Sequence, residues 1–112
     1  MIRAFEKGAS FCDFWINAQT IASGLRVPKS FADHLILQDI YDSEGTAVAV
    51  SDVAILESQK QLASMEGIFA APEGAATLAS LKILIKQGWV HREENIVLFN
   101  TGSGLKYLDH KS

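Results

Sequence analysis

The stretch IVLFNTGSG at residues 96–104 joins an uncharged apolar run to a glycine-rich turn. Such a run is typical of a strand that is covered on both faces in a parallel sheet. Ligands of open α/β sheets bind beyond the carboxyl ends of such strands. Gly102 and Gly104 allow a close backbone approach to a ligand, and Thr101 and Ser103 add hydroxyl groups. The stretch predicts α/β architecture and a candidate ligand site at Thr101–Gly104, although a plain Gly-Ser turn after a strand has the same pattern.

Helical patterns alternate with a second short strand upstream of this stretch. Phe31, Leu35 and Ile40 recur at near-helical spacing, and a helix over 73–87 carries so few charges that most of its circumference should be buried. The expected elements are a helix over 28–45, a strand over 46–50, a helix capped by Ser51 or Asp52 and stopped by Gly67, and a helix over 73–87 closed by Gly88. Two strands would leave unpaired edges. Either a small α/β domain has a further strand, or the chain is a piece of a larger sheet.

The 112 residues correspond to one domain or a fragment of one. Residues 1–27 form an aromatic-rich lead-in with little periodicity, in which Phe5, Phe11, Phe14 and Trp15 suggest a surface that packs against something else. We therefore expect a single partial domain over residues 1–112.

Composition excludes several classes of protein. Hydrophobic residues make up 48% of the chain and charged residues 21%, which is typical of a globular protein. The formal net charge of −3 gives no electrostatic reason to bind nucleic acid, and no apolar run is long enough to cross a bilayer. Cys12 is the single cysteine, and the histidines at 34, 91 and 110 have no metal-ligand spacing. A reducing cytoplasm is the expected compartment.

Three further positions are weaker candidates. Glu73 begins a helix whose N-terminus could face an anion, but an acidic residue in the first turn also simply complements the helix dipole. The small residues of Thr20–Leu25 fit a turn better than a ligand contact. Lys106 follows the glycine turn and is most simply a surface charge.

Four segments together resemble the threonine synthase family. They are TIASGLRVP at 20–28, GTAVAVSD at 45–52, EGIFAAPEGAATL at 66–78 and VLFNTGSGLKY at 97–107. Their order and spacing match the family over nearly the whole chain. The resemblance implies the C-terminal part of the large cofactor domain of a tryptophan-synthase-β-like enzyme that uses pyridoxal phosphate.

This family converts O-phosphohomoserine and water to threonine and phosphate. The resemblance implies that Thr101 offers its hydroxyl to the pyridine nitrogen of the cofactor, and that Gly102, Ser103 and Gly104 form the wall beside it. Glu73 would line the far side of the cleft. The Schiff-base lysine and the phosphate-binding loop of the family lie upstream of the matched region, and Lys106 matches a different lysine.

The resemblance implies no catalytic residue in this chain, so we expect the isolated chain to be inactive. A free-standing binding or oligomerisation module derived from such an enzyme is an alternative, with a homodimer or a missing N-terminal portion completing the sheet. A sister enzyme acting on another amino acid is a second alternative, because upstream residues set much of the substrate specificity.

Overall fold

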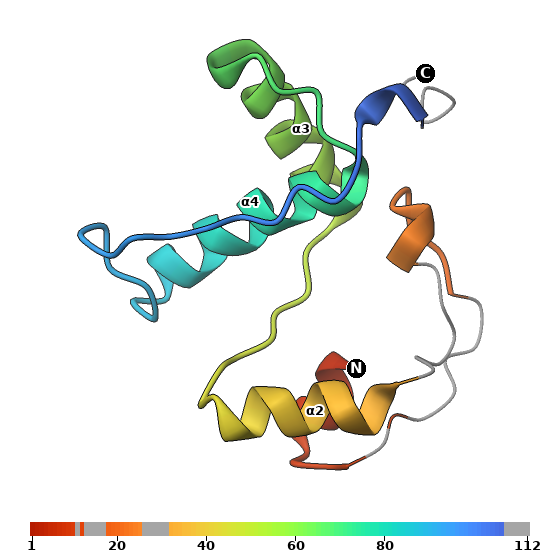
Figure 1. Ribbon diagram of the computed structural model, residues 1–112, viewed down its shortest axis with the longest axis vertical. Helices are drawn as coiled ribbons and strands as arrows, with labels where there is room; N and C mark the ends of the chain where they lie inside the picture. Colours follow the sequence, from red (N-terminus) through yellow and green to blue (C-terminus); the bar gives the residue numbers. More distant parts are fainter. Residues whose placement is uncertain (11, 13–17, 26–31, 107–112) are drawn as a thin grey trace. The chain divides into compact units, whose positions relative to one another are not determined.

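The computed structural model describes residues 1–10, 12, 18–25 and 32–106, and these residues form a largely helical chain. Its helices are α1 (Ile2–Glu6), the 3₁₀ helix η1 (Ser23–Leu25), α2 (Asp33–Asp42), α3 (Asp52–Glu66) and α4 (Pro72–Lys86) (Figure 1). The chain divides into two compact units. Unit 1 comprises Met1–Gln19 and Arg26–Ala49, and unit 2 comprises Thr20–Leu25 and Val50–Ser112.

Unit 1 has a small core of its own around α2. Leu37 is fully buried against Ala4 and Cys12. The ring of Phe5 stacks on Tyr41, with centroids 5.7 Å apart, and the Tyr41 hydroxyl donates a hydrogen bond to the Ala9 carbonyl at 2.6 Å. Part of the lead-in therefore packs within this unit, whereas Phe11, Phe14 and Trp15 lie outside the described residues.

Helix α2 buries a different face from the one that the apolar spacing predicts. Leu35 is 58% exposed, whereas Leu37 is fully buried. The buried carboxylate of Asp33 accepts the Cys12 amide at 2.7 Å and so joins the first turn of α2 to the lead-in. The expected start of this helix at Pro28 falls outside the described residues.

Helix α3 has the expected bounds and the expected end signals. The Ser51 side chain accepts the Ala54 amide at 3.1 Å, which satisfies an otherwise unpaired donor of the first turn. Gly67 ends the helix with φ of 68°, the left-handed conformation that glycine adopts without a Cβ clash. The residues that α3 buries are Ile55, Ser58 and Gln59. Ala63, one turn after Gln59, is exposed.

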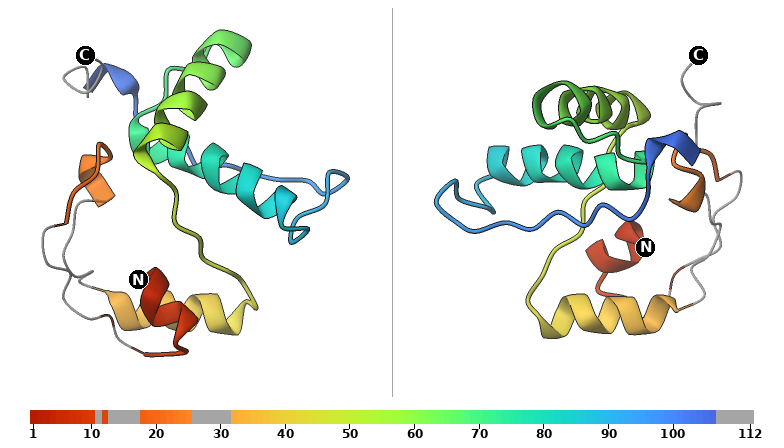
Figure 2. Two further views of the ribbon diagram at one scale, coloured as in Figure 1. Left: turned by 180° about the vertical axis from the view of Figure 1, so that it is seen from behind. Right: turned by 45° about the horizontal axis from the view of Figure 1, so that its top comes forward.

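Helix α4 packs against α3 (Figure 2). Its buried residues lie in its first half. The small residues Ala75, Ala76 and Ala79 are buried and allow the close approach of Ile55 and Ala22. The second half, expected to be covered on most sides, is only half-buried at Ile83, Leu84 and Ile85. The described residues therefore bury one side of α4 and leave its other side partly exposed.

The two expected strands do not appear within the described residues. Residues 46–50 and 96–100 are extended but belong to no ladder, and the one described bridge joins Ala70 to Ser103 in antiparallel fashion. A strand needs a paired neighbour, and no described segment lies along either run as a partner. The described residues therefore show helices joined by extended segments, and not the expected alternation of helices and strands. No helix of the described ranges is long and apolar enough to span a membrane.

Candidate cofactor site

The glycine-rich turn is held against the start of α4 by backbone hydrogen bonds. The Ala71 amide donates to the Gly102 carbonyl at 2.9 Å, and the Gly104 amide donates to the Phe69 carbonyl at 2.9 Å. Ser103 lies opposite Ala70 between these two bonds. Two of the family-like segments, 66–78 and 97–107, are therefore adjacent, although about 30 residues separate the bonded residues in the sequence.

Two glycines of this site lie in close contact with neighbouring side chains. A Cβ atom on Gly104 would overlap the ring of Phe69, and one on Gly74 would overlap the Asn100 side chain. In contrast, a Cβ on Gly102 would make an ordinary contact with Ala71, at 3.5 Å. Gly104 and Gly74 thus let the turn that follows Thr101 lie directly on residues 69–74.

Glu73 attaches a third family-like segment to the same region. Its Oε1 accepts the Gly24 amide at 2.6 Å, in the turn η1. Thr20 donates its hydroxyl to Asp52 at 2.6 Å and accepts the Ala22 amide at 3.2 Å, which joins the other end of this segment to α3. Three segments distant in sequence, 20–25, 69–74 and 100–104, therefore converge in unit 2.

The second carboxylate oxygen of Glu73 is buried and makes no hydrogen bond within the described chain. A buried carboxylate oxygen normally has a donor, because an unpaired one loses the hydrogen bonds it would have in water. The position in the first turn of α4 favours the negative charge but does not supply this donor. Glu73 therefore has both a structural partner, Gly24, and an acceptor site that remains to be satisfied.

Gln59 is a site residue that the sequence pattern does not reveal. Its side chain is 6% exposed, and its amide donates to the Ala70 carbonyl at 2.7 Å. This bond supports the segment against which the glycine turn lies. A glutamine on the apolar face of an expected helix is the signal that could have pointed to it, since a buried amide needs partners.

The predicted site residues differ in their accessibility. Thr101 and Ser103 are exposed, Gly102 and Glu73 are half-buried, and Gly104 is buried. The Thr101 hydroxyl makes no hydrogen bond within the described residues, whereas the Ser103 hydroxyl accepts the Leu105 amide at 3.2 Å. The Thr101 hydroxyl can therefore donate its proton to an added acceptor. The cofactor-binding roles of the five predicted site residues stay predictions.

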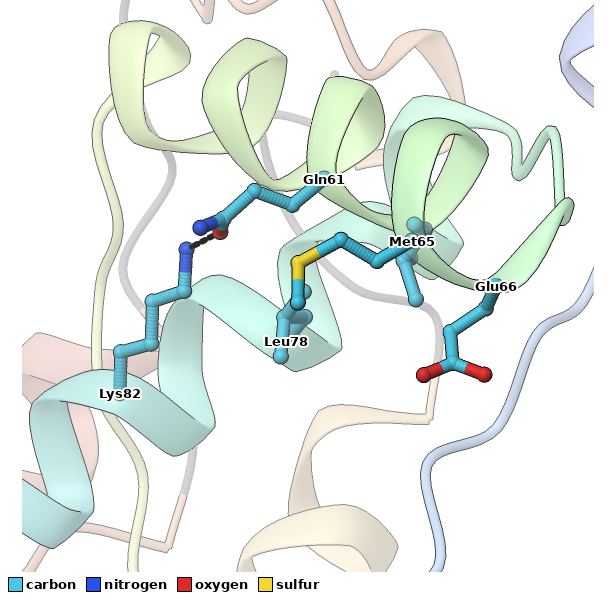
Figure 3. Close-up of a pocket in the computed structure, with 6 residues that line it drawn as sticks. Gln61, Met65, Glu66, Leu78 and Lys82 are labelled. Carbon is cyan, nitrogen blue, oxygen red and sulfur yellow. Dashed lines mark hydrogen bonds between the residues drawn. The ribbon is translucent and has the colours of Figure 1, made fainter.

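A groove between α3 and α4 forms a separate feature of unit 2 (Figure 3). Its volume is about 300 Å³, and it is lined by Gln61, Leu62, Met65, Glu66, Leu78 and Lys82. The Lys82 ammonium donates to the side-chain oxygen of Gln61 and, at 3.4 Å, to the Ser58 hydroxyl. None of these lining residues belongs to the three converging segments.

Residues 1–102 match the family model described as pyridoxal-phosphate dependent enzyme. The chain belongs to this family. It is 42% identical to the threonine synthase of Methanocaldococcus jannaschii over 109 residues, which cover 97% of this chain and 27% of the relative. The threonine synthase of Methanosarcina acetivorans is 36% identical over 95% of this chain, and that of Mycobacterium tuberculosis strain H37Rv is 38% identical over 81%.

The chain spans about a quarter of the length of these curated relatives. It therefore contains a portion of a pyridoxal-phosphate-dependent enzyme, related to threonine synthase. Two polar groups of the portion bear on the fit of the cofactor: the neutral hydroxyl of Thr101 can donate to a pyridine nitrogen, and the buried oxygen of Glu73 is an acceptor without a donor. Backbone hydrogen bonds at Gly102 and Gly104 hold the turn that follows Thr101 against residues 69–71.

Proposed function

We propose that this chain is the C-terminal portion of a threonine synthase, which forms threonine and phosphate from O-phosphohomoserine and water. The observation that carries the proposal is the 42% identity to a threonine synthase over 97% of the chain. The convergence of three of the four family-like segments in unit 2 supports it, because residues that act on one cofactor must lie near one another.

The proposed role of Thr101 is to donate its hydroxyl proton to the pyridine nitrogen of the cofactor. A hydroxyl leaves this nitrogen less protonated than a carboxylate partner would, because it adds no negative charge to stabilise a pyridinium. Gly102, Ser103 and Gly104 form the adjoining wall, and Glu73 lines the far side of the cleft. In this arrangement the residues of this chain bind and orient the cofactor.

Bound pyridoxal phosphate supplies an electron sink for proton removal next to the substrate amine, loss of phosphate and addition of water. The resemblance to the family implies that the lysine bonded to the cofactor and the loop that binds its phosphate lie upstream of the matched region. We therefore propose that the isolated chain is inactive. In the intact domain, residues 46–50 and 96–100 would become strands of the alternating α/β sheet.

A cofactor-trapping experiment tests this proposal. The purified chain is mixed with pyridoxal phosphate, reduced with borohydride, and analysed by mass spectrometry, and threonine formation from O-phosphohomoserine is measured in parallel. We expect no stoichiometric adduct on one lysine and no threonine above background. A single stoichiometric adduct, on Lys106 for instance, or threonine production by the pure chain would overturn the proposal of an inactive portion.

The role of Thr101 is tested in an assembly of this chain with the remaining three quarters of the M. jannaschii relative. Thr101→Val should weaken cofactor retention about tenfold to a hundredfold, because losing a hydrogen bond to a desolvated acceptor costs about 1–3 kcal/mol. Thr101→Ser keeps the hydroxyl and should stay near wild type. Cofactor absorbance after dialysis measures retention, and equal retention by both variants would contradict the assignment.

The same measurements distinguish two alternatives from the proposed function. A sister enzyme of this family would retain the cofactor in the assembly but release a product other than threonine from its own substrate. A binding or oligomerisation module would show specific self-association with no dependence on the cofactor. The exposed apolar side chains of unit 2 are compatible with this second alternative.

A further inference from the structure

The groove between α3 and α4 has an apolar floor that is open to solvent. Leu62 and Leu78 form part of this floor and are half-buried, and Met65 beside them is 74% exposed. The methionine side chain is unbranched and flexible, so it can repack against surfaces of different shape. The groove therefore presents a largely exposed apolar side chain next to a hollow of about 300 Å³.

The two ends of the groove carry opposite charges. Lys82 lies at one end and Glu66 at the other, with Met65 between them (Figure 3). The Lys82 ammonium donates to Gln61 and to the Ser58 hydroxyl, and these bonds leave one of its three protons for a further acceptor. The Glu66 carboxylate makes no hydrogen bond or ion pair within the described residues. Each end can therefore bind a group of the opposite charge.

The groove is too open to enclose a small molecule. Four of its six lining residues are exposed, namely Gln61, Met65, Glu66 and Lys82. Small-molecule sites bury most of the ligand surface, whereas apolar grooves on proteins take up the apolar face of a helix. The exposed lining thus favours a protein surface that lies across the groove. That surface must place an acid opposite Lys82 and a base opposite Glu66.

A second copy of this chain offers those two charges in the required order. When two grooves face each other about a two-fold axis that crosses them at Met65, the Lys82 of each copy lies opposite the partner's Glu66. An axis along the length of the groove would instead place each lysine opposite a lysine, which is unfavourable. A surface with opposite charges at its two ends is therefore complementary to itself in one orientation.

We propose that the groove between α3 and α4 is a self-association face, on which a second copy of this chain docks in the antiparallel orientation. Each Met65 packs over the partner's Leu62 and Leu78, and each Lys82 pairs with the partner's Glu66. An interface about a two-fold axis uses the same patch on both copies, so one patch supplies every contact twice. This inference does not rest on the proposed function, because none of the lining residues belongs to the converging segments 20–25, 69–74 and 100–104.

Sedimentation equilibrium of the full chain tests the docking, and we expect a reversible equilibrium between monomer and dimer. Met65→Asp should weaken the dimer at least about tenfold, because it places a charge at the centre of the interface. Met65→Leu keeps an apolar side chain of similar volume and should stay within about threefold of wild type. The matched control is Val97→Asp, at an apolar side chain that is 82% exposed and does not line the groove, and it should leave the dimer unchanged.

An exchange of charges tests the orientation of the two copies. Lys82→Glu and Glu66→Lys each place like charges opposite each other at both ends, and each should weaken the dimer at least about tenfold. The double variant should recover to within about threefold of wild type, because it pairs opposite charges again. For the same reason, an equimolar mixture of the two single variants should form a heterodimer. Native mass spectrometry with an affinity tag on one variant identifies the heterodimer by its mass.

Three outcomes would overturn the docking proposal. They are a monomer at every concentration, a dimer that Val97→Asp disrupts and Met65→Asp does not, and single charge variants that keep their helices but form no heterodimer on mixing. Circular dichroism shows whether the helices are kept, since Lys82→Glu also removes the bonds to Gln61 and Ser58. If a charge variant loses its helices, the Met65 variants and their control decide the outcome.

The docking and the proposed function fail in different measurements. A dimer that depends on Met65, with no threonine formed by the assembly with the rest of the M. jannaschii relative, would uphold docking and overturn the proposed function. Self-association is expected of an enzyme portion and of an oligomerisation module alike. Cofactor retention by the assembly therefore separates these two.

Discussion

At the scale of single residues, the contact between Gly104 and Phe69 sets how closely the glycine turn lies on the start of α4. Gly104→Ala should destabilise unit 2 by about 1–3 kcal/mol, because the added Cβ would force the Phe69 ring to move in a close-packed site. Urea unfolding followed by circular dichroism measures the change in the free energy of unfolding.

Gly102→Ala is the matched control for this change. Its added Cβ makes an ordinary contact, so the free energy of unfolding should change by no more than about 0.5 kcal/mol. Equal destabilisation by the two substitutions would contradict the packing described at this turn.

Gln59 gives a second prediction at the same scale. Gln59→Leu should cost about 1–3 kcal/mol, because it leaves the carbonyl of the fully buried Ala70 without its donor. Gln87→Leu, at an exposed side chain that makes no hydrogen bond within the described residues, should change the free energy of unfolding by about 0.5 kcal/mol or less. Similar losses for both variants in urea unfolding would exclude a special role for the buried amide.

At the scale of elements, the first turn of α3 depends on the Ser51 cap. Ser51→Ala should destabilise the helix by about 1 kcal/mol, because the Ala54 amide loses its acceptor, whereas Ser51→Asp should retain most of the stability. Hydrogen exchange at the amides of residues 52–54 measures the effect. Faster exchange in Ser51→Asp than in Ser51→Ala would contradict the capping role.

Local signals predicted α3 well because its cap, Ser51, and its terminal glycine, Gly67, adjoin the helix in the sequence, and Pro72 at the first position marks the start of α4. They were less successful for the buried face of α2. Leu35 fits the apolar spacing as well as Leu37 does, and the choice between them is made by Ala4 and Cys12, which come from a distant part of the chain. Periodicity identifies a helix, but tertiary contacts select the face that it buries.

At the scale of the whole molecule, the chain forms two units with small separate cores and leaves large apolar side chains exposed. The second half of α4 is incompletely covered, and residues 46–50 and 96–100 are extended without forming strands in the described structure. A parallel sheet is stabilised by neighbouring strands and by layers on both faces. The expected strands lack these neighbours among the described residues, so their apolar pattern alone does not produce a sheet.

The sequence by itself determined the family, the bounds of α3 and the candidate residues Glu73 and Thr101–Gly104, because these depend on the order of residues along the chain. Only the tertiary structure decided that residues 69–71 pair with 102–104, that Glu73 binds Gly24, and that Gln59 supports Ala70. These contacts join residues from 11 to 49 positions apart. They arise from the packing of α4 on α3 and on Thr20–Leu25, which no local pattern specifies.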